Sequence, residues 1–463
     1  MNRIAGRSRF VLILAAVLVL GLVIFSGEYL FQAKEWVVFP GSPHVYRGSN
    51  LNCGVVTDRT GAVLLDATDG RTYSDDRTVR LATLHLLGDR EGYISAPAVS
   101  EYSSQMVGFD LINGVYSTSG TGGTAVLTIS AKAQKAALEA LDGRKPEYLI
   151  VSHMEPDHGA NIAKLAALYP EMQVVGNAKT FVYMEQFFGP DAVAKERRVV
   201  VKDGESLSLG THTLTFVLAP MVHWPEVTVT YVDKDKTLFS ADGFGKFGTL
   251  DTDEDWACEA RRYYFGIVGK YGAQVQALLK KAAALDIERI CPLHGPVLNE
   301  NLGYYIGLYN TWSSYGVESE GVCIAYTSVY GNTEKATERL AEQLKALGCP
   351  KIAMNNLALC DPAEAVEDAF RYGKLVLASP TYNGDVFPFM KHFIDALCER
   401  NYQNRTIGLI ENGSWAPIAA KKMRAAFEKS RNITFTDTTV TVTSALNDDS
   451  CAKIDALAKE LCR

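Results

Sequence analysis

The chain has 463 residues, of which 47% are hydrophobic and 21% charged, and its formal net charge is −7 at pH 7. This length predicts two or three domains rather than one small core. A modest negative charge without a basic stripe argues against a nucleic-acid-binding protein. The nine cysteines stand singly and form no C-x-x-C pair, which excludes a rubredoxin-like or zinc-ribbon module and is typical of reduced thiols.

The N-terminal segment, residues 1–35, contains an unbroken apolar run over residues 10–25 that follows three arginines. Such a run predicts a membrane anchor, although it is slightly short for a spanning helix. A signal peptide and a fused or misassigned N-terminus are the alternatives. The arginines favour export of the rest of the chain, whereas single cysteines favour the cytoplasm, so the side of the membrane stays open.

The first domain is predicted over residues 36–315. Residues 36–120 are weakly patterned, with short strands expected within 51–70. Periodicity and turn residues beyond them predict strands at 123–130, 148–152 and 172–176, helices at 131–143, 159–169 and 178–189, a strand-rich stretch over 198–243, and two helices over 253–286. Together these predict an α/β domain with antiparallel strands.

The second domain is predicted over residues 320–463, after a polar linker at 312–320. Strands are expected at 322–327, 351–354, 374–379, 406–411 and 437–443, with helices between them and a last helix at 449–462. Five strands that alternate with helices predict a doubly wound five-stranded parallel sheet.

The loop "VSHMEPDHGAN", residues 151–161, follows a predicted strand and carries two histidines and two acids. Pro156 keeps Glu155 out of the helical region, so we expect an extended run in which His153, Glu155 and Asp157 share one face. Three ligands are the minimum for a catalytic metal. The alternative is a solvated loop whose Asp157 caps a helix.

Three further residues, His223, Asp242 and His294, each follow an apolar strand and stand beside glycine or proline. A single histidine in such a place is more often structural. Three together favour a functional site, because sites gather on loops at strand ends.

The segment "TSVYGNTEK" joins the first strand of the second domain to a helix. Its hydroxyls, its glycine and the helix N-terminus predict an anion-binding loop, made of Thr327, Ser328, Tyr330, Gly331, Asn332 and Thr333. It lacks the G-K-[ST] of nucleoside triphosphate sites, and a plain strand–helix turn is the alternative.

Two more strand ends of the same sheet carry glycine, asparagine and an aromatic residue. Ligands of such sheets bind at the carboxyl ends of the strands. The candidate binding residues are Pro380, Thr381, Tyr382, Asn383 and Gly384 after one strand and Asn412, Gly413 and Trp415 after the next. The alternative for Tyr382 and Trp415 is that both are buried packing residues.

Over residues 123–463 the sequence resembles the flavodiiron proteins, or A-type flavoproteins, in "HMEPDHGAN", "HWPE", "LFSADGFG", "PLHGP" and "TSVYGNTEK". The resemblance implies a metallo-β-lactamase-like αββα domain followed by a flavodoxin-like domain. It implies that one iron is held by His153, Glu155 and His223 and a second by Asp157 and His294, with Asp242 as the bridge. His158 either ligates iron or hydrogen-bonds to a ligand. Related zinc hydrolases carry histidine in place of Glu155, and a carboxylate suits iron better.

The resemblance further implies FMN between Tyr382 and Trp415 and an FMN- and di-iron-dependent oxidoreductase that reduces dioxygen to water, nitric oxide to nitrous oxide, or both. A separate donor such as rubredoxin or a rubredoxin reductase system, a head-to-tail homodimer and a cytoplasmic catalytic part are expected, with membrane association through residues 10–25. Two alternatives remain: a metal-dependent hydrolase with an appended flavodoxin, which metal analysis distinguishes, and a non-catalytic electron carrier.

Overall fold

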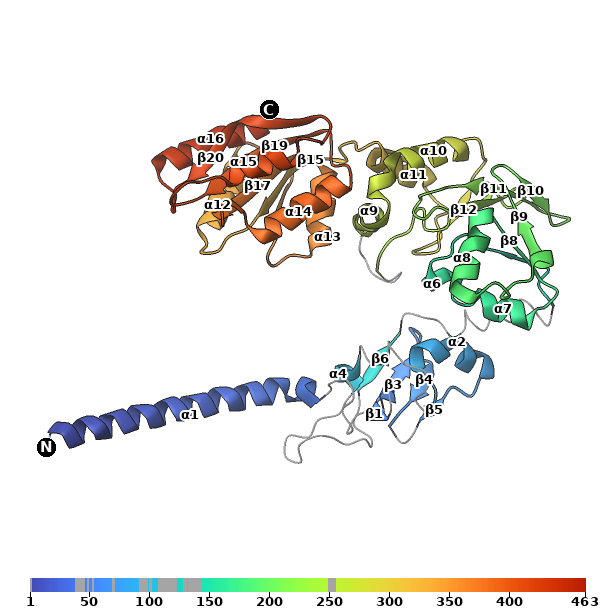
Figure 1. Ribbon diagram of the computed structural model, residues 1–463, viewed down its shortest axis with the longest axis horizontal. Coiled ribbons are helices and arrows are strands. Elements are labelled where there is room, and N and C mark those ends of the chain that lie inside the picture. The colour runs from blue at the N-terminus through green and yellow to red at the C-terminus, as the bar shows by residue number, and fades with distance from the viewer. Residues whose placement is uncertain are drawn as a thin grey trace. The chain divides into compact units, whose positions relative to one another are not determined.

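The computed structural model describes residues 2–37, 46–47, 50–51, 54–68, 71–90, 99, 102–106, 123–127, 131 and 144–463 apart from 249–254. The chain divides into two compact units, Met1–Lys145 and Pro146–Arg463, and each is described by itself (Figure 1).

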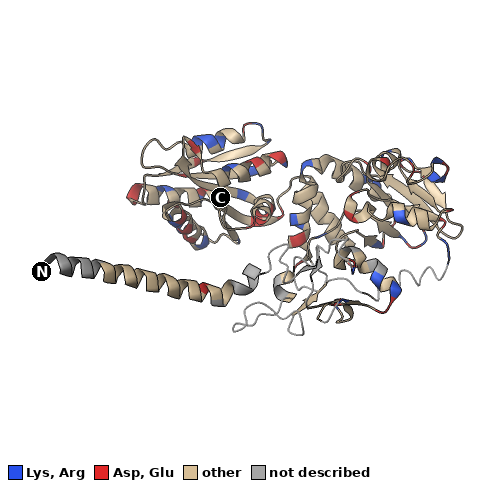
Figure 2. Ribbon diagram, turned by 60° about the horizontal axis from the view of Figure 1, so that its bottom comes forward, with Lys and Arg blue, Asp and Glu red and all other residues tan. Residues whose placement is uncertain are grey.

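The first unit begins with the long helix α1, Asn2–Val37. Its segment Val11–Tyr29 is long and apolar enough to cross a membrane, a test that a signal sequence also passes. Figure 2 shows the described part of α1 almost wholly in the colour of uncharged residues, and Glu28 is the one acid among its described side chains. The apolar run therefore continues as helix beyond residue 25, and the anchor and the signal peptide both stay compatible with it.

The rest of the first unit holds a four-stranded sheet of order β5-β4-β3-β6. Its strands and the neighbouring elements are β1 Tyr46–Arg47, β2 Asn50–Leu51, β3 Val55–Thr57, β4 Val63–Asp66, β5 Thr72–Tyr73, α2 Arg77–Leu87, α4 Ser103–Met106 and β6 Thr124–Val126. Short strands within 51–70 are confirmed, and β6 is the described part of the strand predicted at 123–130. The helix predicted at 131–143 lies outside the described residues beyond residue 131.

The second unit opens with a three-stranded parallel sheet, order β7-β8-β9, and a five-stranded mixed sheet, order β10-β11-β12-β13-β14. The elements are β7 Tyr148–Ile150, α6 Pro156–Gly159, α7 Ile162–Leu168, β8 Gln173–Gly176, α8 Ala178–Phe188, β9 Arg198–Val200, β10 Ser206–Ser208, β11 Thr213–Leu218, β12 Thr228–Val232, β13 Thr237–Phe239, α9 Trp256–Ile267, α10 Gly272–Ala282, β14 Arg289–Cys291 and α11 Leu302–Ser313, with short 3₁₀ turns at Lys195–Arg197 and Gly269–Tyr271.

These elements stack in four layers. Val174, Phe181 and Met184 belong to the core between the three-stranded sheet and α7 and α8. Phe216 lies in the core between the two sheets, and Tyr264 in the core between the five-stranded sheet and α9–α11. The predicted αββα domain is confirmed.

The C-terminal half of the second unit is a parallel sheet of order β16-β15-β17-β19-β20, to which β18 adds antiparallel at the end of β17. Its elements are β15 Ser319–Tyr326, α12 Asn332–Ala346, β16 Ile352–Asn356, α13 Pro362–Arg371, β17 Tyr372–Tyr382, β18 Asp385–Val386, α14 Pro388–Glu399, β19 Arg405–Asn412, α15 Ala419–Ala426, β20 Ile433–Val442 and α16 Asp448–Leu461. The predicted doubly wound sheet with five parallel strands is confirmed.

Alternation along the strands separates the two faces of this sheet. On β15, Val322 and Ile324 pack with α12 and α16, whereas Cys323 and Ala325 pack with the core that contains α13, α14 and α15. Helices therefore cover both faces, as Figure 1 shows, and the sheet leaves only its edges and strand ends for ligands.

The junction between the two halves of this unit is buried and hydrogen-bonded. Residues 312–320 contain the end of α11 and the start of β15, and Trp312 is buried. Arg405, which is also buried, donates from its guanidinium to the carbonyls of Tyr315, Gly316 and Phe370. The short connection is thereby fixed to the flavodoxin-like sheet.

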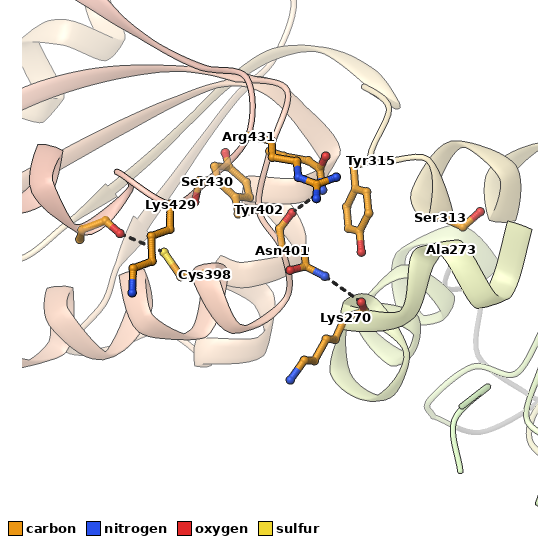
Figure 3. Close-up of a pocket in the computed structure, with 12 residues that line it drawn as sticks. Lys270, Ala273, Ser313, Tyr315, Cys398, Asn401, Tyr402, Lys429, Ser430 and Arg431 are labelled. Carbon is orange, nitrogen blue, oxygen red and sulfur yellow. Dashed lines mark hydrogen bonds between the residues drawn. The ribbon is translucent and has the colours of Figure 1, made fainter. Parts of the chain in front are cut away.

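A cavity of about 620 Å³ lies at this junction (Figure 3). Asn401 Nδ2 donates to the carbonyl of Lys270 at 2.8 Å across it. None of the predicted site residues lines the cavity, so it is separate from both candidate sites.

A buried ion-pair network also connects the two halves of the second unit at this junction. Arg261 of α9 makes a bidentate pair with Glu318, both nitrogen–oxygen distances being 2.6 Å, and also pairs with Glu367 of α13. Trp312 Nε1 donates to the same Glu318 carboxylate at 2.6 Å. Arg261 thus pairs with both carboxylates, so each charged side chain of the network has a partner of opposite charge.

Loss of Arg261 should therefore destabilise the second unit. Arg261→Met leaves buried Glu367 without its cation and removes the bidentate partner of Glu318, which costs about 3–5 kcal/mol. Arg262→Met is the matched control, because Arg262 makes more exposed pairs with Glu259 and Asp361, worth about 0–1 kcal/mol. Urea unfolding followed by tryptophan fluorescence measures both, and equal midpoints for the two variants would contradict the role of the network.

Candidate functional site

The predicted metal-binding residues lie on loops at one edge of the paired sheets. His153, Glu155, Asp157 and His158 follow β7, His223 follows β11, Asp242 follows β13 and His294 follows β14. β11, β13 and β14 run in the same direction, so their carboxyl ends meet at one edge. The backbone hydrogen bond from Thr228 to Ser152, 2.9 Å, joins the loop after β7 to that edge.

The first group brings together His153, Glu155, His223 and Asp242. His223 Nε2 lies 3.0 Å from Glu155 Oε2, 2.9 Å from Asp242 Oδ2 and 3.3 Å from His153 Nε2. Two imidazole nitrogens and two carboxylate oxygens thus converge on one point.

The second group brings together Asp157, His158 and His294. His294 Nε2 lies 3.1 Å from both Asp157 Oδ2 and His158 Nε2. His158 Nε2 is also 3.1 Å from Asp242 Oδ1. The two oxygens of Asp242 therefore face different groups, and His158 lies inside the second one.

The expectation that residues 153–157 form one extended run is wrong at Asp157. Glu155 is extended, with ψ 140°, as its place before Pro156 predicted. Pro156 then begins the helical turn α6, because proline is well suited to the first position of a helix. The turn carries Asp157 and His158 away from the first group and into the second.

The charges of the cluster shift its protonation. Burial alone would raise the pKa of Asp242, but hydrogen bonds from His158 and His223 hold that pKa well below its usual range. Burial alone would lower the pKa of His158 and His223, and the hydrogen bond and charge of Asp242 raise both instead. The carboxylate of Asp242 therefore favours the protonated forms of His158 and His223.

Glu226 contributes to the site although it was not predicted as a site residue. Its fully buried Oε1 lies 2.7 Å from His153 Nδ1 and accepts a hydrogen bond from the backbone N–H of Met154 at 2.9 Å. The pKa of Glu226 is lowered, because these bonds outweigh the effect of burial. A carboxylate at Nδ1 leaves Nε2 free to bind a metal. The signal in the sequence was an acid among apolar residues in "HWPEVTVTYV".

Two aromatic residues that were not predicted also border the cluster. The ring of Trp224 meets that of His153 edge to face at 5.1 Å between centroids. The ring of Tyr263 lies 5.7 Å from that of His294, and burial raises the pKa of its hydroxyl. Both restrict the room around the histidines.

A third group of metal-binding side chains, Cys258, Glu259 and Glu364, lies between α9 and α13. The guanidinium of Arg262 is 2.9 Å from Glu259 and 3.5 Å from Glu364. The arginine already supplies the cation there, so this group is an ion-pair cluster.

The predicted FMN-binding residues lie at the carboxyl ends of β15, β17 and β19 and in the segments that directly follow them, and these strands are neighbours in the sheet. Gly331 has a φ of 80° and precedes α12, whose 15 residues give the loop a helix N-terminus. Such a terminus stabilises bound phosphate. The structure thus brings the three predicted segments to one edge.

Several polar side chains of these loops also bond within the protein. Thr381 Oγ1 accepts from the backbone N–H groups of Ile418 and Ala419. The amide of Asn412 exchanges two hydrogen bonds with the backbone of Ser444. These bonds fix the segment after β19 to the end of β17, and the end of β19 to the loop after β20.

The aromatic residues of the three loops are exposed. Tyr330 is 90% exposed, Trp415 83% and Tyr382 47%. The alternative that Tyr382 and Trp415 are buried packing residues is therefore wrong, and both rings are available to a flat ligand.

Two family models match the chain. Residues 125–295 match the ODP family beta lactamase and residues 323–441 match a flavodoxin domain. A putative diflavin flavoprotein A of Synechocystis is 28% identical over 63% of this chain, and the match spans only 50% of that relative. A nitric oxide reductase of Moorella thermoacetica is 28% identical over 58% of this chain and 68% of its own.

Two solved structures share the fold. The rubredoxin oxygen:oxidoreductase of Desulfovibrio gigas aligns with a TM-score of 0.64 and 24% identity over 71% of this chain and 83% of its own. The flavodiiron protein of Giardia intestinalis aligns with a TM-score of 0.60 and 22% identity over 72% and 83%. The chain thus consists of a beta-lactamase-like domain followed by a flavodoxin domain and shares its fold with a solved flavodiiron protein.

Proposed function

We propose that this chain is a flavodiiron oxidoreductase that reduces dioxygen to water, nitric oxide to nitrous oxide, or both. The observation that carries the proposal is the position of Asp242, whose two oxygens each face a separate group of histidines and carboxylates. The names of the relatives include both activities, and the two groups suit either gas.

The side chains fit two metal ions. In each group two imidazole nitrogens lie 3.1–3.3 Å apart, with carboxylate oxygens beside them, so that one cation could accept lone pairs from all of these atoms. Asp242 Oδ1 is buried and makes no hydrogen bond of good geometry, although His158 Nε2 lies 3.1 Å away. We assign His153, Glu155 and His223 to one iron, Asp157, His158 and His294 to the other, and Asp242 to both.

The donor set distinguishes iron from zinc. All seven side chains offer nitrogen or oxygen and none offers thiolate, and a carboxylate at Glu155 makes the first group harder and more negative. This argues against a zinc hydrolase. Seven intact ligand positions argue against an electron carrier with an inactive metal domain.

The loops after β15, β17 and β19 fit FMN. We assign the phosphate to residues 327–333 at the start of α12 and the ring to the space between Tyr382 and Trp415. FMN held by these segments would supply electron-transfer chemistry, and the two ligand groups would hold the irons at which the gas would be reduced. The chain positions these groups: Glu226 orients His153, and Asp242 holds both metal groups at one spacing.

We further propose the domain boundaries 36–315 and 320–463 and a separate electron donor, because the chain contains no C-x-x-C pair of a rubredoxin-like module. A head-to-tail homodimer is proposed from the family pattern. We propose that α1 anchors the chain to a membrane with the catalytic part in the cytoplasm.

The purified full-length chain should contain about one FMN and about two iron ions, as one phosphate loop and two ligand groups require. Elemental analysis and flavin extraction measure both. The reduced protein, mixed anaerobically with either O2 or NO in a stopped-flow instrument, should reoxidise with at least one of them. Stoichiometric zinc without iron would contradict the proposal.

Glu155→His should shift the first group from iron to zinc and abolish gas reduction. It replaces an anionic oxygen by a neutral nitrogen and recreates the His-x-His-x-Asp-His order of zinc hydrolases. The flavin spectrum should survive, because FMN binds in the other domain. Glu196→His, at an exposed position with no described side-chain partner, is the control and should keep its iron. Parental iron content and turnover in Glu155→His would show that Glu155 does not bind metal.

Thr333→Val should weaken FMN binding while the iron content stays constant. It removes a hydroxyl at the start of α12 that we expect to bond the phosphate, a loss of about 1–3 kcal/mol. Thr337→Val is the matched control, because the Thr337 hydroxyl donates to the carbonyl of Glu334 within the same helix. Fluorescence titration of apoprotein with FMN gives the affinities. Equal affinities for both variants would mean that the loop does not bind phosphate through Thr333.

A further inference from the structure

An apolar cavity of about 160 Å³ lies among α10, α11, β13 and β14. Every residue that lines it is leucine, isoleucine, alanine or phenylalanine. Ala283 and Ile306 are exposed at its outer end, and Leu279 and Ala282 line it from α10. Cavities of this composition stay dry and bind small apolar molecules.

This cavity continues towards the metal-binding loops. A smaller space of about 20 Å³ shares Leu238, Phe244, Leu279 and Ala282 with it, and is large enough for one small molecule. Its other walls include Val222, Ser240 and Gly243. Val222 directly precedes His223, and Ser240 and Gly243 enclose Asp242, so the inner end lies against both ligand-bearing turns.

The polar groups at the inner end are already hydrogen-bonded. Ser240 Oγ donates to the carbonyl of Gly243 at 2.6 Å, and Tyr309 Oη accepts from the N–H of Phe244 at 2.6 Å. A water molecule needs two to four polar partners to remain in such a space. The inner space therefore excludes water.

A different kind of space adjoins the other side of His223. It is more open, has a volume of about 560 Å³, and is lined by polar as well as apolar groups, including Gln186 and the hydroxyl-bearing Tyr183 and Tyr271. Water and protons suit that side. The metal-binding cluster thus has one approach that suits water and protons and another that suits apolar molecules.

We propose that the dry cavity between α10 and β13–β14 binds small apolar diatomic gases and delivers them to the turns of Asp242 and His223. Dioxygen and nitric oxide share the required chemistry, since both are small, uncharged and weakly hydrated. That these gases are the substrates rests on the proposed function, whereas the capacity of the cavity for an apolar gas does not.

Xenon is the probe, because it is apolar, inert and independent of turnover. The full-length protein loaded with iron and FMN is titrated with xenon under pressure and followed by ¹²⁹Xe NMR. Ala282→Phe should abolish the bound signal, because Ala282 lines both spaces. Ala284→Phe is the matched control, since Ala284 is exposed two residues further on and lines neither space. Ala282→Leu, a smaller change, serves if the phenylalanine variant does not fold by circular dichroism.

Turnover gives the second readout. Ala282→Phe should raise the KM for the gas roughly fivefold, because it slows access, and leave kcat unchanged. Ala284→Phe should match the parent in both constants. Parent protein that binds no xenon overturns the proposal, and so does Ala282→Phe that loses xenon but keeps the parental KM. If the parent reduces neither gas but binds xenon at Ala282, the proposed function fails and the apolar gas site stands.

Discussion

The carboxylate of Asp242 is the constraint on which the metal-binding half of this protein depends. It is almost fully buried, and its two oxygens face His223 on one side and His158 on the other. A carboxylate in such a place is stable only with opposite charge on both sides. The turn after β13, the loop after β11 and the turn α6 must therefore keep their relative positions, and the two paired sheets fix them by bringing these loops to one edge.

The sequence predicted those parts of the fold that rest on local patterns. Strands with apolar alternation, helices that begin at a polar cap, and ligand residues at strand ends were all recognisable. α11 was missed because "LGYYIGLYNTWS" has two glycines and three tyrosines, which favour helix weakly. Its helical state comes from the packing of Tyr309 and Trp312 in the core, and contacts over such distances along the chain leave no periodic signal.

The candidate site residues divide in the same way, into those that local patterns predict and those that depend on contacts distant along the chain. His153, His223, Asp242 and His294 could be found by type and position, because each follows a strand. The local pattern placed Asp157 on one face with His153 and Glu155, and only the family resemblance assigned it to the second iron, because its position depends on the helical turn that begins at Pro156. Glu226 was hidden for another reason: its role comes from a hydrogen bond to His153, 73 positions away in the sequence.

The metal-binding half and the flavodoxin-like half of the second unit are held to each other by the contacts at their junction. Arg261 ties α9 to Glu318, directly before β15, and to Glu367 on α13, while Arg405 holds Tyr315 and Gly316. α9 also carries Tyr263, whose ring lies near His294. A helix that is anchored by buried charge at the flavodoxin-like domain therefore also borders the metal-binding cluster. Because Arg261 fixes α9 at the junction, a shift of α9 there would also move Tyr263 relative to the metal-binding cluster.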